Sequence, residues 1–337
     1  MGSADDGKDQ IKGKKMNPRT TVVIPNYNGK KYLKECMDSL KKSTIPIKII
    51  LVDNGSEDGS IAFMKESYPQ VRLLAFPENR GFSAAVNAGI RAADTEYVLL
   101  LNNDTRSEPE LVAELEKVLD QEEKALCAGA KMVSMCQPQY LDGAGDYYCA
   151  LGWAFARGKD QDRNRFGEPD RTFSACAGAA LYRKSLLEEI GLFDEEHFAY
   201  LEDVDVGYRG NIYGYPSRYA PSAVVFHAGS GVSGSRHNKF KVELSARNSI
   251  YLIYKNMPFL QMLLNLPFLL VGYGAKLLFF LRKGLGASYL KGLLDGFALS
   301  FSAKGRQHKV RFRVTRLGNY LWIQGQLWLN MIRRLKG

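Results

Sequence analysis

The chain has 337 residues, of which 45% are hydrophobic and 24% are charged, a composition that excludes wholesale disorder and allows one large core or two smaller ones. Its five scattered cysteines include no CxxC pair, which favours reduced thiols over a disulfide framework or a zinc site. The net charge of +10 is uneven, because residues 256–337 carry thirteen lysines and arginines against the single acid Asp295, which indicates an anionic partner surface.

The first part of the chain shows an α/β rhythm after a polar leader. Residues 1–18 lack the apolar core of a secretory signal, and we expect them to be a disordered leader. Strands are then predicted at 20–24, 47–52, 71–75 and 97–101, and helices at about 33–40, 59–67 and 82–92. Strands separated by helices predict a mostly parallel central sheet with helices on both faces.

Two acidic segments lie roughly a hundred residues apart in the sequence. The apolar run Tyr97–Leu101 stops at Asn102-Asn103-Asp104, as a buried parallel strand does where it ends at a ligand crevice. A carboxylate there can hold a divalent cation against a diphosphate, and a carboxylate of the later segment FAYLEDVDVG can take a proton from a hydroxyl. Sugar transfer from a nucleotide needs both functions, although a strand-end turn and a solvated acidic loop would also explain the two segments.

The pattern loosens after Leu126. Residues 137–171 form a polar segment with several aromatic residues, including Trp153, which we interpret as a loop facing an acceptor. Further on, a buried strand is expected at 176–182, a helix at 184–189 and a strand at 223–226, just before His227.

The region 256–337 is predicted to be helical, amphipathic and basic. Its apolar stretch 258–281 is interrupted by polar residues, proline and glycines, which favours a helical pair lying in a membrane interface over one spanning helix. The last helix, around 321–332, fits the same interpretation because basic residues follow it. Packing on the catalytic domain or on another subunit of a homo-oligomer is the alternative. We do not expect nucleic-acid binding, since such a site would not need the apolar stretch.

Six sequence features follow one another along the chain: VVIPNYNG, VDNGSEDGS, ENRGFSAAVNAGI, LLNNDT, EDVDVGYR and an isolated His227. Together they resemble family 2 glycosyltransferases of the GT-A fold, most closely the bacterial rhamnosyltransferase-like branch. The resemblance implies a GT-A catalytic domain at 19–255, with a nucleotide-binding half (19–105) and an acceptor-binding half (106–255), followed by the helical region 256–337.

The resemblance assigns the first loops to the nucleotide. Pro25, Tyr27 and Asn28 lie on a loop between a strand and a helix, where Tyr27 is expected to stack near the base. Asp53 ends the second strand and is expected to accept a hydrogen bond from a pyrimidine imide.

Further residues are assigned to the diphosphate and its cation. Asn79 and Arg80 precede a helix N-terminus, which favours anions, although Arg80 could also be a solvated charge. Asn103 is expected to contact the sugar or ribose. Asp104 and His227 are expected to bind Mg²⁺ or Mn²⁺, with His227 as a hydrogen-bonded structural residue the alternative.

The later acidic segment is assigned to catalysis. The resemblance makes Asp203 the general base and Glu202 an acceptor-orienting residue, with the reverse assignment open, while Asp205 is expected to cap the helix. Trp153 and Glu202 would contact the acceptor. Attack by the acceptor hydroxyl in a single displacement inverts the anomeric configuration.

The expected function is therefore an inverting, metal-dependent transferase in the synthesis of a bacterial cell-surface polysaccharide. The branch favours dTDP-rhamnose as donor, with a UDP-hexose open. The basic apolar region favours a lipid-linked glycan acceptor and a cytoplasmic protein held peripherally on the anionic inner face of the cell membrane. A non-catalytic nucleotide-sugar-binding scaffold is the alternative.

Overall fold

The computed structural model describes residues 17–229 and 238–335, so nearly all of the predicted leader lies outside the described residues. The predicted α/β rhythm of the first hundred residues is confirmed, with shifts of a few residues. The elements are β1 (Thr20–Asn26), α1 (Lys30–Leu40), β2 (Ile47–Asn54), α2 (Ser60–Ser67), β3 (Arg72–Phe76), α3 (Phe82–Ala92) and β4 (Tyr97–Leu101).

The strands form one mixed sheet in the order β10-β12-β6-β11-β4-β1-β2-β3, with β5 paired to β12 and β7 to β6. Its later strands are β5 (Thr105–Ser107), β6 (Cys127–Ser134), β7 (Leu141–Gly143), β10 (Asp170–Thr172), β11 (Ala179–Arg183) and β12 (Ser217–His227). The half β4-β1-β2-β3 is parallel, whereas β11 runs antiparallel to both β4 and β6. The carboxyl ends of β1, β2 and β4 therefore meet at one edge.

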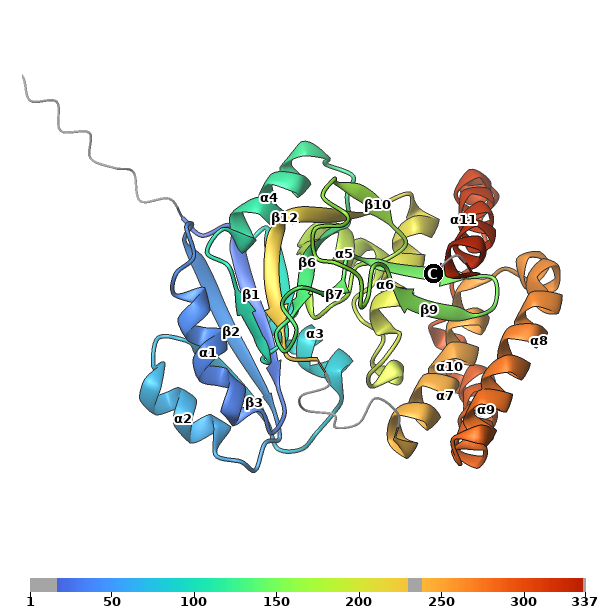
Figure 1. Cartoon of the computed structure of the whole chain (residues 1–337), viewed down its shortest axis with the longest axis horizontal. Coiled ribbons are helices and arrows are strands. Elements are labelled where there is room, and N and C mark those ends of the chain that lie inside the picture. Colours follow the sequence, from blue (N-terminus) through green and yellow to red (C-terminus); the bar gives the residue numbers. More distant parts are fainter. Residues whose placement is uncertain (1–16, 230–237, 336–337) are drawn as a thin grey trace, which may run out of the picture.

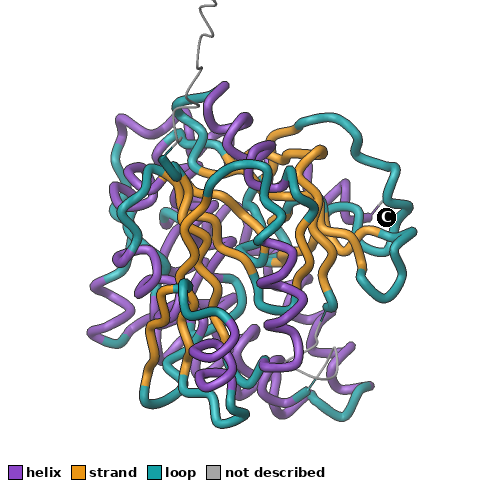
Figure 2. The backbone as a smooth tube through the Cα atoms, turned by 90° about the vertical axis from the view of Figure 1, so that its left-hand side faces the viewer, coloured by secondary structure: helices purple, strands orange, loops and turns teal. Residues whose placement is uncertain are grey.

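Hydrophobic clusters lie on both faces of this sheet. One face is covered by α1, α2 and α4 (Leu111–Gln121), and the other by α3, α5 (Lys184–Ile190) and α6 (Glu202–Tyr213). Figure 2 shows the long strands side by side with helical segments around them. All five residues of β4 are buried, which explains why its sequence is an unbroken apolar run.

The interpretation of 137–171 as one irregular loop is wrong. The segment contains β7 and the first residues of β10, both of the main sheet, and a separate hairpin of β8 (Asp146–Cys149) and β9 (Trp153–Ala156). Strand β6 was also not predicted, because its first residues, Cys127-Ala128-Gly129-Ala130, are small and show no strand alternation. Small residues fit here because a side chain at Gly129 would meet the Ala175 methyl at 2.9 Å.

The C-terminal helices pack on the catalytic domain at one end of the molecule (Figure 1). They are α7 (Lys239–Asn256), α8 (Phe259–Arg282), α9 (Gly286–Phe301), α10 (Ala303–Gln307) and α11 (Leu317–Leu335), and two short 3₁₀ turns occur at Glu195–His197 and Val314–Arg316. The helical pair predicted at 258–281 is wrong, since α8 is one helix that continues through Pro267. It is the one helix of the described residues that is long and apolar enough to cross a bilayer.

Close backbone contacts attach α9 and α11 to the rest of the protein. A Cβ atom at Gly292 or Gly296 of α9 would come within 2.3 or 2.5 Å of a carbonyl oxygen of α7, so only glycine allows this approach. Helix α11 meets the β8–β9 hairpin, where Asn330 Nδ2 donates to the Tyr148 carbonyl (3.0 Å). These contacts support the alternative that the helical region packs on the catalytic domain, and they leave the outer face of α8 exposed.

Candidate active site

A cavity of about 1100 Å³ lies between the carboxyl ends of the parallel strands and the C-terminal helices. Eight residues predicted from the sequence line it: Pro25, Tyr27, Asn79, Asn103, Asp104, Glu202, Asp203 and His227. Helices α7, α8 and α9 supply much of the opposite wall, including Lys241, Ser245, Ser249, Lys276, Phe280 and Tyr289. The two acidic segments are therefore brought to one cavity, as the sequence predicted.

The donor loops are connected by a chain of side-chain hydrogen bonds. Asn103 Nδ2 donates to Asn26 Oδ1 (2.6 Å), and Asn26 Nδ2 donates to Asp53 Oδ2 (2.8 Å). The Ser56 backbone N–H donates to Asp53 Oδ1 (2.9 Å), and Asp53 has no exposed surface. The predicted contact between Asp53 and a base is therefore not supported, because the carboxylate is enclosed and already bonded to the loop. Its observed role is to hold Asn26 and, through it, Asn103.

The other predicted nucleotide contacts divide into two groups. Tyr27 is 40% exposed and lines the cavity, so its ring is open to a ligand. Asn28 does not line it, and instead its Oδ1 accepts from the Glu57 N–H at 2.9 Å. Asn79 lines the cavity and its Oδ1 accepts from the Gly81 N–H at 2.9 Å, while the Arg80 guanidinium lies outside, over the Phe76 ring. In this conformation the Arg80 side chain is about half exposed (52%), and its guanidinium lies 3.9 Å from a carboxylate oxygen of Glu195.

Strand pairing places the two predicted metal ligands together. Thr105 of β5 is opposite His227 of β12, and the Ala228 N–H donates to the Asp104 carbonyl (3.0 Å). Asp104 Oδ1 and His227 Nε2 lie 3.2 Å apart, while His227 Nδ1 bonds to Asp142 Oδ2 (2.7 Å). Burial alone would lower the pKa of His227, but Asp104 and Asp142 outweigh it and raise that pKa to about 9. The carboxylates of Asp104 and Asp142 therefore favour a positive charge at this position.

These donors fit a divalent cation. Neighbouring ligands of an octahedral Mg²⁺ with bonds of about 2.1 Å lie about 3 Å apart, close to the 3.2 Å between Asp104 and His227. Asp142 would fix the ring so that Nε2 presents its lone pair, as outer carboxylates do for metal-bound histidines. Sequence reasoning did not assign Asp142 to the site, because it lies 85 residues from His227 and no local motif links the two.

The predicted base is presented by an unusual turn before α6. Phe198, Tyr200 and Leu201 have φ values of 60°, 70° and 67°, a region that residues other than glycine rarely adopt and that often marks functional sites. Asn248 of α7 holds this turn, since its buried Nδ2 lies 2.8 Å from each of the carbonyls of His197, Ala199 and Tyr200. The turn directs the first residues of α6 to the cavity.

The two carboxyl groups at the start of α6 differ in their surroundings. Asp203 is half-buried, and its Oδ1 accepts from the Val204 N–H (2.8 Å). Burial raises the pKa of Asp203, which makes it a stronger proton acceptor than an exposed aspartate. Burial and the neighbouring Asp203 raise the pKa of Glu202 much further, and its Oε2 has no hydrogen-bond partner among the described residues. The raised pKa of Glu202 favours its neutral form more strongly than that of Asp203, so the assignment of Asp203 as the base stays a prediction.

A second group of possible ligands lies beside the base. Polar atoms of Asp146, Cys176 and Asp203 lie within 4.8 Å of one another. Burial raises the pKa of all three, so the group tends to hold protons rather than the negative charge that a hard cation requires. The fit of Asp104 and His227 to Mg²⁺ or Mn²⁺ is better.

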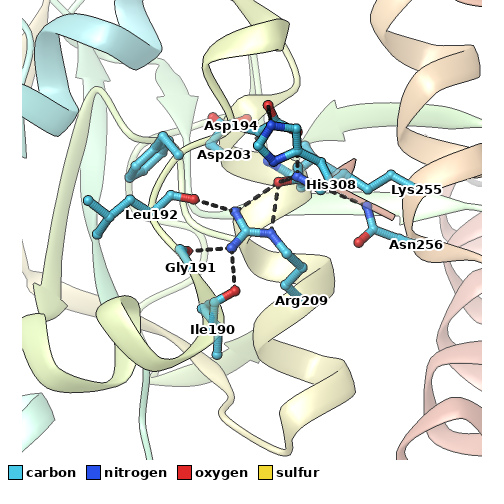
Figure 3. A network of polar contacts seen from close by, with 12 residues as sticks. Ile190, Gly191, Leu192, Asp194, Asp203, Arg209, Lys255, Asn256 and His308 are labelled. Carbon is cyan, nitrogen blue, oxygen red and sulfur yellow. Dashed lines mark hydrogen bonds and ion pairs between the residues drawn. The ribbon is translucent and has the colours of Figure 1, made fainter. Parts of the chain in front are cut away.

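Asp205 does not cap α6, contrary to the prediction. It is completely buried, with Oδ2 accepting from Arg209 Nε (2.9 Å) and Lys255 Nζ (2.9 Å) and Oδ1 accepting from Asn256 Nδ2 (2.8 Å). Figure 3 shows Arg209, Lys255 and Asn256 converging here, and Lys255 also donates to Asp194 (2.7 Å). Although burial opposes ionisation, the two cations hold the pKa of Asp205 far below its usual range. The network fixes α6, and hence Asp203, to α7.

Trp153 does not line the cavity. Its Nε1 donates to the Gly272 carbonyl of α8 (3.1 Å), and Lys276 Nζ lies 5.6 Å from the centre of its ring. Lys276 itself does line the cavity, and sequence reasoning counted it only as a charge that interrupts an apolar stretch. Its position one turn after Gly272 becomes informative only when the contact between α8 and the β8–β9 hairpin is known.

Comparisons with known proteins agree with this geometry. The model of glycosyl transferase family 2 matches residues 21–191. The chain is 30% identical over 236 residues to an N-acetylglucosaminyl-diphospho-decaprenol L-rhamnosyltransferase of Mycobacterium tuberculosis, covering 61% of this chain and 75% of that protein.

Two solved structures share the fold at low sequence identity. A mannosyltransferase of Pyrobaculum calidifontis, in complex with GDP-Man and Mn²⁺, has a TM-score of 0.51 and 18% identity over 87% of this chain and 83% of its own. GalNAc-T7 with UDP, GalNAc and Mn²⁺ has a TM-score of 0.57 and 16% identity over 71% of this chain and 48% of its own. With this fold and the family match over half of its length, the chain is a glycosyltransferase and belongs to glycosyl transferase family 2.

Proposed function

We propose that this glycosyltransferase inverts the anomeric centre, depends on a divalent cation and transfers rhamnose from dTDP-rhamnose to a lipid-linked glycan. The observation that carries the proposal is the meeting of Asp203 with Asp104 and His227 around one cavity. The transferred sugar and the acceptor are inferred from the mycobacterial relative, whose name states rhamnosyl transfer to a diphospho-decaprenol-linked sugar. The dTDP carrier is inferred from the resemblance of the sequence motifs to the rhamnosyltransferase-like branch. Because the similar structures hold UDP and GDP-Man, a UDP-hexose is the second candidate donor.

The proposed reaction is a single displacement. Asp203 accepts the proton of the acceptor hydroxyl while that oxygen forms a bond to the anomeric carbon, and the bond from this carbon to the diphosphate oxygen breaks on the opposite side. The nucleoside diphosphate leaves with the bonding electron pair. A cation held by Asp104 and His227 would neutralise the charge that develops on the diphosphate. Asn103 and Tyr27 would hold the sugar and the base.

We expect one nucleotide sugar of a dTDP-, UDP- and GDP-sugar panel to be turned over in the presence of Mg²⁺ or Mn²⁺. The measurement is release of nucleoside diphosphate, which slow hydrolysis of the donor produces even without an acceptor. EDTA should abolish the release, and added Mn²⁺ should restore it. Turnover that persists in EDTA would contradict the role of Asp104 and His227, and nucleotide binding without any turnover after addition of prenyl-diphosphate-linked GlcNAc would favour a non-catalytic binder.

We further propose that α8 and α9 dock on the anionic inner face of the cell membrane. Their outer surface exposes large apolar residues, including Leu260 (77%), Leu270 (66%), Leu294 (70%) and Phe301 (60%). Both helices lie at the end of the molecule opposite β3 (Figure 1), and thirteen basic residues occur in 256–337. An apolar face combined with basic residues is typical of proteins that lie on a membrane surface.

Leu270→Glu is expected to weaken binding to anionic vesicles roughly tenfold, since burial of a leucine stabilises by about 1.5–3 kcal/mol. Flotation with phosphatidylglycerol vesicles measures the effect. Tyr140→Glu is the matched control, because Tyr140 is a 39% exposed aromatic residue of the catalytic domain. If Leu270→Glu left flotation unchanged but converted a dimer to a monomer in size-exclusion chromatography, this surface would be a subunit interface instead.

A further inference from the structure

Lys276 is a cation inside the active-site cavity that the donor chemistry described above does not use. It lies on α8 and lines the cavity together with Phe280 and Tyr289. Among the described residues, no carboxylate lies within ion-pair distance of its ammonium group, although Asp203 and Glu202 line the same cavity. Burial lowers the pKa of Lys276 to about 8. Lys276 is half-buried, and a partly desolvated cation without a carboxylate partner gains stability when an anion binds beside it.

A second polar group of the same wall also lacks a partner. Tyr289 is 2% exposed, and its hydroxyl makes no hydrogen bond within the described residues. Its ring lies beside Phe280, with the centroids 5.1 Å apart. A buried hydroxyl without a hydrogen-bond partner destabilises a folded protein, and a ligand that forms a hydrogen bond with it removes this cost. Lys276 and Tyr289 thus offer one charged and one neutral donor to an acceptor of hydrogen bonds.

The same helix connects this wall to the exposed apolar surface. Phe279 and Leu278, next to Phe280 in α8, are 43% and 60% exposed. Trp153 fixes this part of α8, since it donates to Gly272 and carries the Lys276 ammonium above its ring. A ligand with an anionic head in the cavity and an apolar tail on the outer face of α8 would bind both the polar donors of the cavity and the exposed apolar residues of the helix. Asp104 and His227, the proposed ligands of the donor's cation, lie just before β5 and at the end of β12, and not on these helices.

We propose that Lys276 and Tyr289 bind the diphosphate of a prenyl-diphosphate-linked acceptor, whose chain leaves the cavity along α8. This inference rests on the proposed function, because it names the acceptor subsite of the same cavity. Binding of the acceptor diphosphate would explain why an apolar helix contains a lysine at this position. Trp153 would then act on the acceptor indirectly, because it holds Lys276 in place.

The test uses the full chain with geranylgeranyl diphosphate as probe, and with inorganic diphosphate and geranylgeraniol as separate arms. Lys276→Gln is expected to weaken binding of geranylgeranyl diphosphate about tenfold or more, since a charge-assisted hydrogen bond is lost. Lys276→Arg should recover most of the affinity. Lys283→Gln is the matched control, because Lys283 is an exposed lysine at the end of the same helix. Thermal melting verifies that each variant is folded.

Each other outcome would overturn the proposal. Unchanged probe affinity in Lys276→Gln means that Lys276 does not bind the acceptor diphosphate. An equal loss of dTDP and UDP affinity means that Lys276 binds the donor. Inorganic diphosphate that binds as tightly as the probe, with the same dependence on Lys276, means a site for free diphosphate. Release of nucleoside diphosphate from the donor panel is measured separately, so failure of this subsite is distinguishable from failure of the proposed transferase reaction.

Discussion

Asp203→Asn is expected to lower the rate of sugar transfer by about 10²- to 10⁴-fold, which is the usual contribution of a positioned general base. An amide at this position cannot accept the acceptor proton, but it keeps the size of the side chain and can still accept from the Val204 N–H. The measurement is product formation with the donor that the nucleotide-sugar panel identifies and a prenyl-diphosphate-linked acceptor. The effect should fall on kcat, because the interaction is made in the transition state.

Glu202→Gln is the matched control for this result. Glu202 precedes Asp203 in the same helix and lines the same cavity, but burial and the neighbouring Asp203 raise the pKa of its carboxyl group well above the usual value and so favour the neutral form. We therefore expect a much smaller loss in Glu202→Gln, with a rise in KM for the acceptor if Glu202 orients it. A larger loss in Glu202→Gln than in Asp203→Asn would reverse the assignment of the base.

Asp205→Ala is expected to destabilise the fold by about 3–5 kcal/mol, because it leaves two buried cations without their carboxylate. Arg209 would keep only backbone carbonyl partners, and Lys255 would keep only Asp194. The free energy of unfolding is measured from urea denaturation curves, with the slope compared to verify a single transition. Since the pKa of Asp205 is depressed, its contribution is present above about pH 4, where an unfolded aspartate is ionised, and is lost only as pH falls towards the folded-state pKa.

The exposed pair of Lys48 and Asp94 provides the comparison. Their side chains lie 2.7 Å apart but are 46% and 71% exposed, so solvent screens the attraction. Asp94→Ala should leave the urea midpoint unchanged within error. An Asp205→Ala variant that unfolds at the same midpoint as Asp94→Ala would mean that the buried network does not stabilise the native state.

The sequence predicted the parallel half of the sheet well because its signals are local. Continuous apolar strands such as Tyr97–Leu101 and the spacing of Leu33, Cys36, Met37 and Leu40 are properties of short segments. The site residues at strand ends, such as Asp104, follow from the same logic, since parallel strands end at a common edge. Strand β6 was not predicted, because its small residues are required by close packing in the interior and produce no periodic hydrophobic pattern in the sequence.

The errors concern contacts between distant segments. Asp53 was assigned to the base from its position at a strand end, but its enclosure depends on Asn26 and Ser56. Asp205 was expected to cap the start of its helix, whereas its partner Lys255 lies 50 residues further on. Whether a charged residue near a helix start faces solvent or a buried cation is decided by tertiary packing.

The composition of the chain changes abruptly near residue 256, yet the folded protein has no structural boundary there. Helix α7 ends at Asn256, and its side chains bond both to the turn before Asp203 and to Asp205. Beyond it, Lys276, Phe280 and Tyr289 line one side of the cavity, and the opposite side comes from the end of β1 and the residues that follow β4. Cutting the polypeptide where its charge changes would therefore remove part of the lining of the candidate active site, so the basic segment belongs to the same structural unit as the strands on the other side of the cavity.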